Sequence, residues 1–81
     1  MKEYYVSYRY ENGSEVSVGL LHGTSPMDIA NSIIRDIFKI KNAYASKISE
    51  LHIDDYRTVI AVKSYSQGNH INYYTLQYKI L

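Results

Sequence analysis

The stretch SPMDIANSIIRDIFKIK, residues 25–41, decides the fold of this chain. Ser25 is a good N-cap, Pro26 suits the first helical position, and Asp28 falls in the first turn, where the helix dipole favours an anion. Apolar side chains then cover about half of the helical circumference at ~100° per residue. This stripe consists of Met27, Ile29, Ala30, Ile33, Ile34, Ile37, Phe38 and Ile40. The pattern predicts one helix at about residues 26–41 that lies across a sheet.

The residues before this helix alternate as the two strands of a β-hairpin. The apolar rows are Tyr4, Val6, Tyr8 and Tyr10 in the first strand and Val16, Val18 and Leu20 in the second. A three-residue loop, Glu11-Asn12-Gly13, with Gly13 in the left-handed conformation, brings both rows to one face, whereas a two-residue turn would separate them. The same register sets Arg9 opposite Glu15 as an ion pair. The predicted apolar pairs are Tyr8–Val16, Val6–Val18 and Tyr4–Leu20.

The residues after the helix predict a meander of three strands, at about 47–53, 57–65 and 70–81. In the first of them Leu51 and Ile53 are expected to point inward. A three-residue loop, Gln67-Gly68-Asn69, joins the last two strands. The expected pairs are Val62 with Tyr74, Ile60 with Leu76, Lys63 with Tyr73 and Tyr65 with Ile71. A one-residue slip of this hairpin, which would bury Val59 and Ala61 instead, stays open.

The predicted element order is ββαβββ, and residues 1–81 have the length of a single domain. The fold class is α+β, with a single helix packed on one face of a five-stranded, mainly antiparallel sheet. The helix returns the chain to the end where the second strand began. An antiparallel sheet in the order 2-1-5-4-3 is therefore possible, and it places the polar second and third strands at the edges. A β-grasp-like arrangement is the competing topology.

The composition excludes several classes of protein. The absence of cysteine rules out a disulfide framework, a cysteine-based zinc site and a thiol nucleophile. Nine basic against eight acidic residues give a net charge of +1, far from that of a dedicated nucleic-acid binder. No apolar run approaches the ~20 residues that span a membrane, and the first ten residues do not form a signal peptide. We therefore expect a soluble, cytoplasmic protein.

The sequence contains no motif typical of catalysis. The three histidines, His22, His52 and His70, fall in a loop, on an edge strand and in a turn, with no metal-ligand spacing. Asp54-Asp55 is read as a turn signal between strands, because adjacent carboxylates are common there. The segment 22–26 provides hydroxyls at a helix N-terminus, and simple capping explains them. We expect no enzyme, no cofactor and no metal site.

The ten tyrosines are the most unusual feature of the composition. Most of them are expected on the helix-covered face, because a tyrosine ring packs while its hydroxyl reaches water or a partner. The opposite face should still carry tyrosines, a lysine and an arginine, and tyrosine together with arginine is typical of interface hot spots. The residues predicted to contact a partner are Tyr5, Arg9, Lys63, Tyr65, Ile71 and Tyr73.

These features predict a small, non-catalytic protein-binding domain. Its size and architecture resemble those of small phage or mobile-element products that inhibit host defence, including anti-CRISPR proteins. The resemblance implies a protein partner inside the host cell and rests on size and architecture alone. Two alternatives stay open. One is a nucleic-acid-binding module that uses tyrosine stacking and the basic helix end, where Arg35, Lys39, Lys41 and Lys47 cluster. The other is an accessory structural homodimer.

Overall fold

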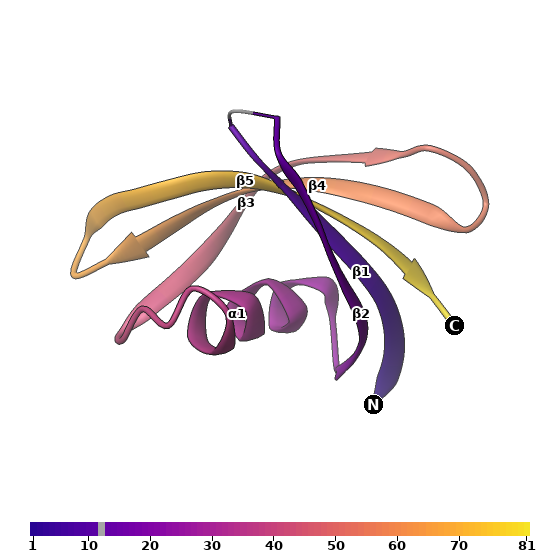
Figure 1. Ribbon diagram of the computed structural model, residues 1–81, viewed down its shortest axis with the longest axis horizontal. Coiled ribbons are helices and arrows are strands. Elements are labelled where there is room, and N and C mark those ends of the chain that lie inside the picture. Colours follow the sequence, from indigo (N-terminus) through magenta and orange to yellow (C-terminus); the bar gives the residue numbers. More distant parts are fainter. Residues whose placement is uncertain (12) are drawn as a thin grey trace.

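The computed structural model describes residues 1–11 and 13–81, and of residue 70 the backbone only. The predicted order of two strands, one helix and three strands is confirmed (Figure 1). The elements are β1 (Lys2–Tyr10), β2 (Glu15–Gly23), α1 (Pro26–Asp36), β3 (Ala43–His52), β4 (Arg57–Ser66) and β5 (Asn69–Ile80).

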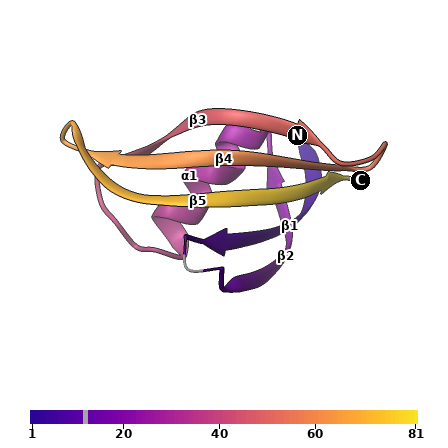
Figure 2. The same cartoon turned by 90° about the horizontal axis from the view of Figure 1, so that it is seen from above.

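The five strands form one antiparallel sheet in the order β2-β1-β5-β4-β3, as predicted, and not a β-grasp-like arrangement. Helix α1 lies against one face of this sheet, and the opposite face has no helix over it (Figures 1 and 2). The β1–β2 hairpin crosses the other three strands obliquely, as expected where the twist between strands accumulates (Figure 1). We call the face away from α1 the outer face.

The β1–β2 hairpin follows the predicted register only near its turn. Arg9 lies opposite Glu15, as predicted, and their side chains form an ion pair of 3.3 Å. Gly13 has the predicted left-handed φ of 89°, and its N–H donates to the Tyr10 carbonyl at 3.0 Å. Asn12, the middle residue of the predicted loop, lies outside the described residues.

Farther from the turn a β-bulge shifts this hairpin by one residue. The bulge falls beside Gly19, whose φ of 99° is a conformation that side chains rarely adopt. Consequently Tyr4 lies opposite Leu21, and Leu20 is 55% exposed. Of the three predicted apolar pairs, Tyr8–Val16 is confirmed, whereas Val6–Val18 and Tyr4–Leu20 are wrong.

Helix α1 begins as predicted and ends five residues early. The Ser25 hydroxyl accepts a hydrogen bond from the Asp28 N–H at 3.2 Å, which confirms the N-cap. At the other end, Ile37 is the C-cap, and Lys39, two residues farther on, adopts a left-handed φ of 57° that turns the chain away from the helix direction. Ile37, expected in the apolar stripe, is therefore 40% exposed. Phe38 still packs on the core, with its ring 5.4 Å from that of Tyr74.

Strand β3 begins at Ala43, earlier than predicted, and a bulge between Lys47 and Ser49 changes its facing. Beyond the bulge Leu51 lies opposite Val59, a residue of the outer face. The expectation that Leu51 and Ile53 point inward is wrong, since they are 66% and 47% exposed. The predicted strand assumed a regular register, and one extra residue moves every following side chain to the other face.

The β4–β5 hairpin confirms the predicted core register. Val62 lies opposite Tyr74 and Ile60 opposite Leu76, so the one-residue slip is excluded. The turn itself differs from the prediction. It contains two residues, Gln67 and Gly68, with φ of 53° and 80°, as in a type I′ turn. A bulge between Ser64 and Tyr65, near this turn, then restores the predicted pairing in the rest of the hairpin.

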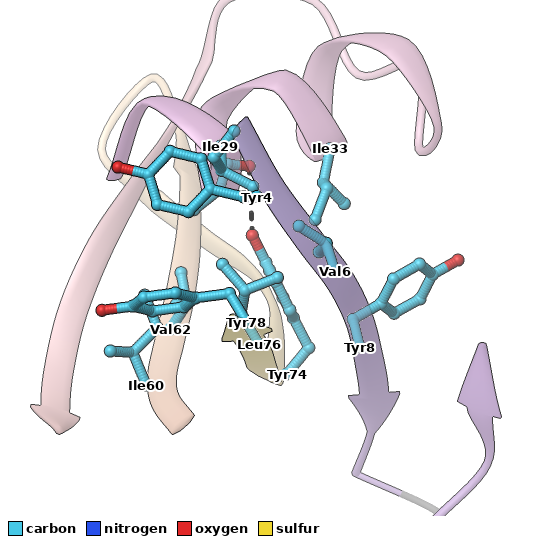
Figure 3. Close-up of a cluster of buried hydrophobic side chains, with 11 residues drawn as sticks. Tyr4, Val6, Tyr8, Ile29, Ile33, Ile60, Val62, Tyr74, Leu76 and Tyr78 are labelled. Carbon is cyan, nitrogen blue, oxygen red and sulfur yellow. Dashed lines mark hydrogen bonds between the residues drawn. The ribbon is translucent and has the colours of Figure 1, made fainter. Parts of the chain in front are cut away.

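The core lies between α1 and the helix-facing side of the sheet, and tyrosines form much of it (Figure 3). Tyr4 and Tyr74 are among its largest fully buried side chains. The Tyr74 hydroxyl reaches α1 and donates a hydrogen bond to the Ala30 carbonyl at 3.1 Å, which satisfies its buried polar group (Figure 3). The cluster comprises Tyr4, Val6, Tyr8, Ile29, Ala30, Ile33, Ile60, Val62, Tyr74, Leu76 and Tyr78.

These buried tyrosines lead to a prediction about alkaline pH. Burial, with a contribution from the Tyr10 hydroxyl, raises the pKa of Tyr8 from 10.0 to about 12, and burial also raises the pKa of Tyr74. A raised folded-state pKa stabilises the fold below the unfolded pKa near 10, and this stability is lost as pH rises through the folded value. We therefore expect the free energy of unfolding to fall between pH 10 and pH 12.

Absorbance titration of tyrosinate formation, together with urea unfolding at each pH, measures this effect. Tyr8 and Tyr74 should ionise only as the domain unfolds. Ionisation of all ten tyrosines as one group near pH 10 in a folded domain would contradict the assignment of Tyr8 and Tyr74 to the core.

Candidate functional site

A group of aromatic side chains lies on the outer face at the end of the sheet that carries the β4–β5 turn. The rings of Tyr44 in β3 and Tyr65 in β4 stack, with centroids 5.6 Å apart and planes inclined by 22°. One row along, Lys63 lies between Ser46 of β3 and Tyr73 of β5. We call Tyr44, Lys63, Tyr65 and Tyr73 the tyrosine cluster.

Tyr44 is the member of this cluster that the sequence analysis missed. It is 52% exposed, and it lies opposite Tyr65 in the first part of β3. The third strand was predicted to begin at residue 47, which left Tyr44 in a loop. The available signal was the alternation of Tyr44 and Ser46 with the small residues Ala43 and Ala45.

The structure brings together three of the six predicted partner residues, Lys63, Tyr65 and Tyr73. Lys63 and Tyr73 form the predicted pair, whereas Tyr65 lies opposite His70 and not opposite Ile71 as predicted. The extra residue of the bulge near the turn causes this change. Ile71 is 37% exposed.

The other two predicted residues, Tyr5 and Arg9, lie away from the tyrosine cluster. Tyr5 is 54% exposed and shares a row with Lys79 and Arg57. Arg57 and Tyr65 are eight residues apart in β4, which at ~3.3 Å per residue is roughly 26 Å. Arg9 lies between the two ends and is engaged by Glu15. A partner that contacts Tyr5 and Tyr65 together has to span most of the outer face.

The basic residues at the end of α1 are only partly brought together. Arg35, Lys39 and Lys41 line one pocket of about 590 Å³, together with Asn31 and Asn42. Lys47, expected in the same cluster, instead makes an ion pair of 3.5 Å with Glu50 farther along β3. The structure thus places three of the four predicted cations in one concave site.

Two of the three histidines considered for catalysis have local partners, whereas the side chain of His70 lies outside the described part of the structure. His22 approaches Glu3 at 3.4 Å, and His52 contacts Thr58 at 3.0 Å and Glu50 at 3.2 Å. Within the part of the chain that the structure describes, no three His, Cys, Asp or Glu side chains are placed to hold a metal ion.

The acidic pair between β3 and β4 acts in a turn. The Asp54 carboxylate accepts hydrogen bonds of 2.8 Å from the N–H groups of Tyr56 and Arg57 and one of 2.9 Å from the Arg57 Nε. The backbone N–H of Tyr56 and then the Arg57 side chain lower the pKa of Asp54. A carboxylate held in this way is a hydrogen-bond acceptor for the turn and a poor general base.

The N-terminus of α1 is likewise occupied by its own side chains. Asp28 accepts a hydrogen bond from the Thr24 N–H at 2.9 Å, while Ser25 caps the Asp28 N–H. The carboxylate of Asp28 therefore already supplies the negative charge that a helix N-terminus favours.

Comparison of this chain with protein-family models, with curated proteins and with solved structures finds no significant match. Among the described residues, no helix is long and apolar enough to cross a membrane.

Proposed function

We propose that this chain is a small, non-catalytic protein-binding domain and that the tyrosine cluster is the centre of its contact surface. The observation that supports the proposal is the stacked pair Tyr44–Tyr65 on the outer face, beside Lys63 and Tyr73. Grouped aromatic rings on a face with no covering helix are typical of interface hot spots. The cluster lies on three adjacent strands of the sheet, so its rings are held in place before a partner binds.

The charge around the cluster indicates the kind of partner surface. Residues 37–49 and 56–81, which include all of β4 and β5, contain no aspartate or glutamate. Lys63, in the middle of the cluster, makes no ion pair among the described residues. A partner with acidic groups around an apolar centre complements this surface.

The biological setting of this proposal comes from size and architecture. A single small α+β domain with a tyrosine-rich binding face is similar to the small inhibitors that phages and mobile elements direct at host defence complexes. We therefore propose an anti-CRISPR-like inhibitor that acts in the cytoplasm of a host cell. This part of the proposal rests on a similarity of size and architecture and not on a similarity of binding sites.

Site-specific photo-crosslinking tests the contact surface. A photoreactive phenylalanine analogue at position 65 should crosslink to a partner protein captured from host lysate. The same analogue at position 56, which is a 69% exposed tyrosine at the opposite end of the sheet, is the matched control. Crosslinks from position 56 with none from position 65 would move the binding site away from the tyrosine cluster.

Nucleic-acid binding is the second candidate, because the basic pocket and the stacked tyrosines lie on neighbouring segments, residues 35–43 and Tyr44. Bases stack on exposed aromatic rings, and phosphates bind to lysine and arginine. Titration of a fluorescent single-stranded oligonucleotide at two salt concentrations separates this candidate from protein binding, since phosphate contacts weaken steeply with salt.

Self-association is the third candidate, with the outer faces of two copies packed together. Size-exclusion chromatography with light scattering over a range of concentrations distinguishes a dimer from a monomeric binder.

A further inference from the structure

The pocket at the C-terminal end of α1 gathers more positive than negative charge, since Asp36 pairs with only one of its cations. Arg35, Lys39 and Lys41 all line it, and no carboxylate does. All three side chains are exposed, so water screens their mutual repulsion. Cations gathered on one concave surface nevertheless attract an anion.

The cations remain available to a ligand. Among the residues that the structure describes, no acidic side chain forms an ion pair with Lys39 or Lys41. Arg35 is held by Asp36, which accepts from its Nε at 3.0 Å and its Nη2 at 3.2 Å. This contact leaves the Nη1 group of the guanidinium free to donate.

The backbone of the same loop has an unusual conformation. Lys39 and Asn42 adopt left-handed φ values of 57° and 55°. Glycine is the usual residue where a helix ends in this conformation, because a side chain there is sterically unfavourable. A lysine at position 39 is therefore a poor choice for stability alone. Non-glycine residues held in such conformations are concentrated at ligand-binding sites.

If these lysines had a structural role alone, they would stabilise the negative end of the helix dipole. The hydrogen bonds at this end of α1 make such a role less necessary. The Ile33 carbonyl accepts from the N–H groups of both Ile37 and Phe38, and the Ile34 carbonyl accepts from Ile40. Carbonyls that already have donors need less compensation from lysine ammonium groups.

We propose that this pocket binds a small anion carrying at least two linked phosphate groups, such as the diphosphate of a nucleotide. Lys39, Lys41 and the free Nη1 group of Arg35 offer three separate donor groups, which two linked phosphates can engage more fully than one. The volume of about 590 Å³ also lies in the range of small-molecule sites. Lysine ammonium groups and the arginine fork are the common phosphate ligands in proteins. This proposal does not depend on the tyrosine cluster.

The test is a titration of the isotopically labelled full chain with pyrophosphate at low ionic strength, followed by NMR. We expect saturable shifts of backbone amides confined to residues 35–43. The double change Lys39→Gln with Lys41→Gln should weaken binding at least tenfold. Lys2→Gln removes the same charge from an exposed lysine at the start of β1 and should leave the affinity unchanged.

Lys39→Gly separates a ligand role from a structural one. Glycine relieves the left-handed conformation, so the melting temperature should stay the same or rise, while the affinity for pyrophosphate should fall several-fold. If the melting temperature falls and the affinity is retained, Lys39 serves the helix end and the proposal is wrong.

Three other results would also overturn the proposal. The first is the absence of saturable shifts with pyrophosphate. The second is equal weakening by Lys2→Gln, which would indicate diffuse attraction by net charge. The third is binding of a single-stranded oligonucleotide at residues 35–43 without binding of pyrophosphate, which would assign the pocket to a nucleic-acid backbone.

Discussion

Tyr74→Ala is expected to remove a large part of the stability of this domain. The Tyr74 ring is fully buried and makes edge contacts with the rings of Tyr8 and Phe38, at centroid distances of 6.3 Å and 5.4 Å. Truncation of a buried aromatic residue to alanine typically costs ~3–5 kcal/mol. A domain of this size has a total stability of roughly 4–12 kcal/mol. Urea unfolding followed by circular dichroism measures the loss.

Two further variants separate the contribution of the Tyr74 ring from that of its hydroxyl and compare the two faces of β5. Tyr74→Phe keeps the ring and removes the hydrogen bond to the Ala30 carbonyl, so it should cost only ~0.5–1.5 kcal/mol. Tyr73→Ala changes the preceding residue, which lies on the outer face opposite Lys63, and should cost less than about 1 kcal/mol. If Tyr73→Ala were the more damaging of the two alanine variants, the two faces of β5 would be exchanged.

The sequence predicted the fold because its strongest patterns are local and agree with one another. The alternation in β4 and β5 favoured the pairs Val62–Tyr74 and Ile60–Leu76, with a one-residue slip left open, and the N-cap at Ser25 indicated where α1 begins. With one amphipathic helix in the middle of five strands, few sheet orders keep all connections short, and the observed order is one of them.

The errors came from β-bulges, which a strict period of two cannot represent. Bulges in β2 and β3 place Leu20 and Leu51 on the outer face, whereas the prediction had placed both residues in the core. An isolated glycine in a strand is a recognised signal of a bulge, so Gly19 was informative. Nothing comparable marks the bulge between Lys47 and Ser49. The position of this second bulge is set by packing across the sheet and not by the local sequence.

The bulges in the two edge strands have a common physical consequence. β2 and β3 form the edges of the sheet, and each contains a bulge. In β3 the Ala45 N–H also donates to the Asn31 side chain of α1, at 2.8 Å. Interrupted or covered edges pair poorly with further strands. This arrangement favours partner binding through the outer face over addition of a strand to the sheet.

The tyrosine cluster was predictable only in part, for the same reason. Lys63, Tyr65 and Tyr73 were placed on one face from the alternation of β4 and β5. Tyr44 was missed because its strand follows an unexpected helix end, at which Lys39 adopts the left-handed conformation. A lysine in that conformation has no sequence signature, since glycine or asparagine is the usual residue.

The double change Tyr65→Ala with Tyr73→Ala is expected to abolish partner binding while the domain stays folded. Both rings belong to the outer face, so their loss opens no cavity beside Tyr74 or Val62. Truncation of an aromatic hot spot costs ~2 kcal/mol or more, and two such losses weaken a complex several hundred-fold or more. Calorimetric titration with the partner identified by crosslinking measures the effect, and circular dichroism checks the fold.

The matched control is Tyr56→Ala, which removes an exposed tyrosine from the opposite end of the sheet. If the contact is centred on the tyrosine cluster, this variant should bind nearly as well as the unchanged chain. A nucleic-acid partner would give a different pattern. In that case Lys39→Glu with Lys41→Glu would be as damaging as the loss of the tyrosines, and the affinity would fall steeply with salt. Full binding by the Tyr65→Ala, Tyr73→Ala variant, together with loss in the lysine variant, would refute the protein-binding proposal, because binding would then depend on the charge of the pocket and not on the rings of the outer face.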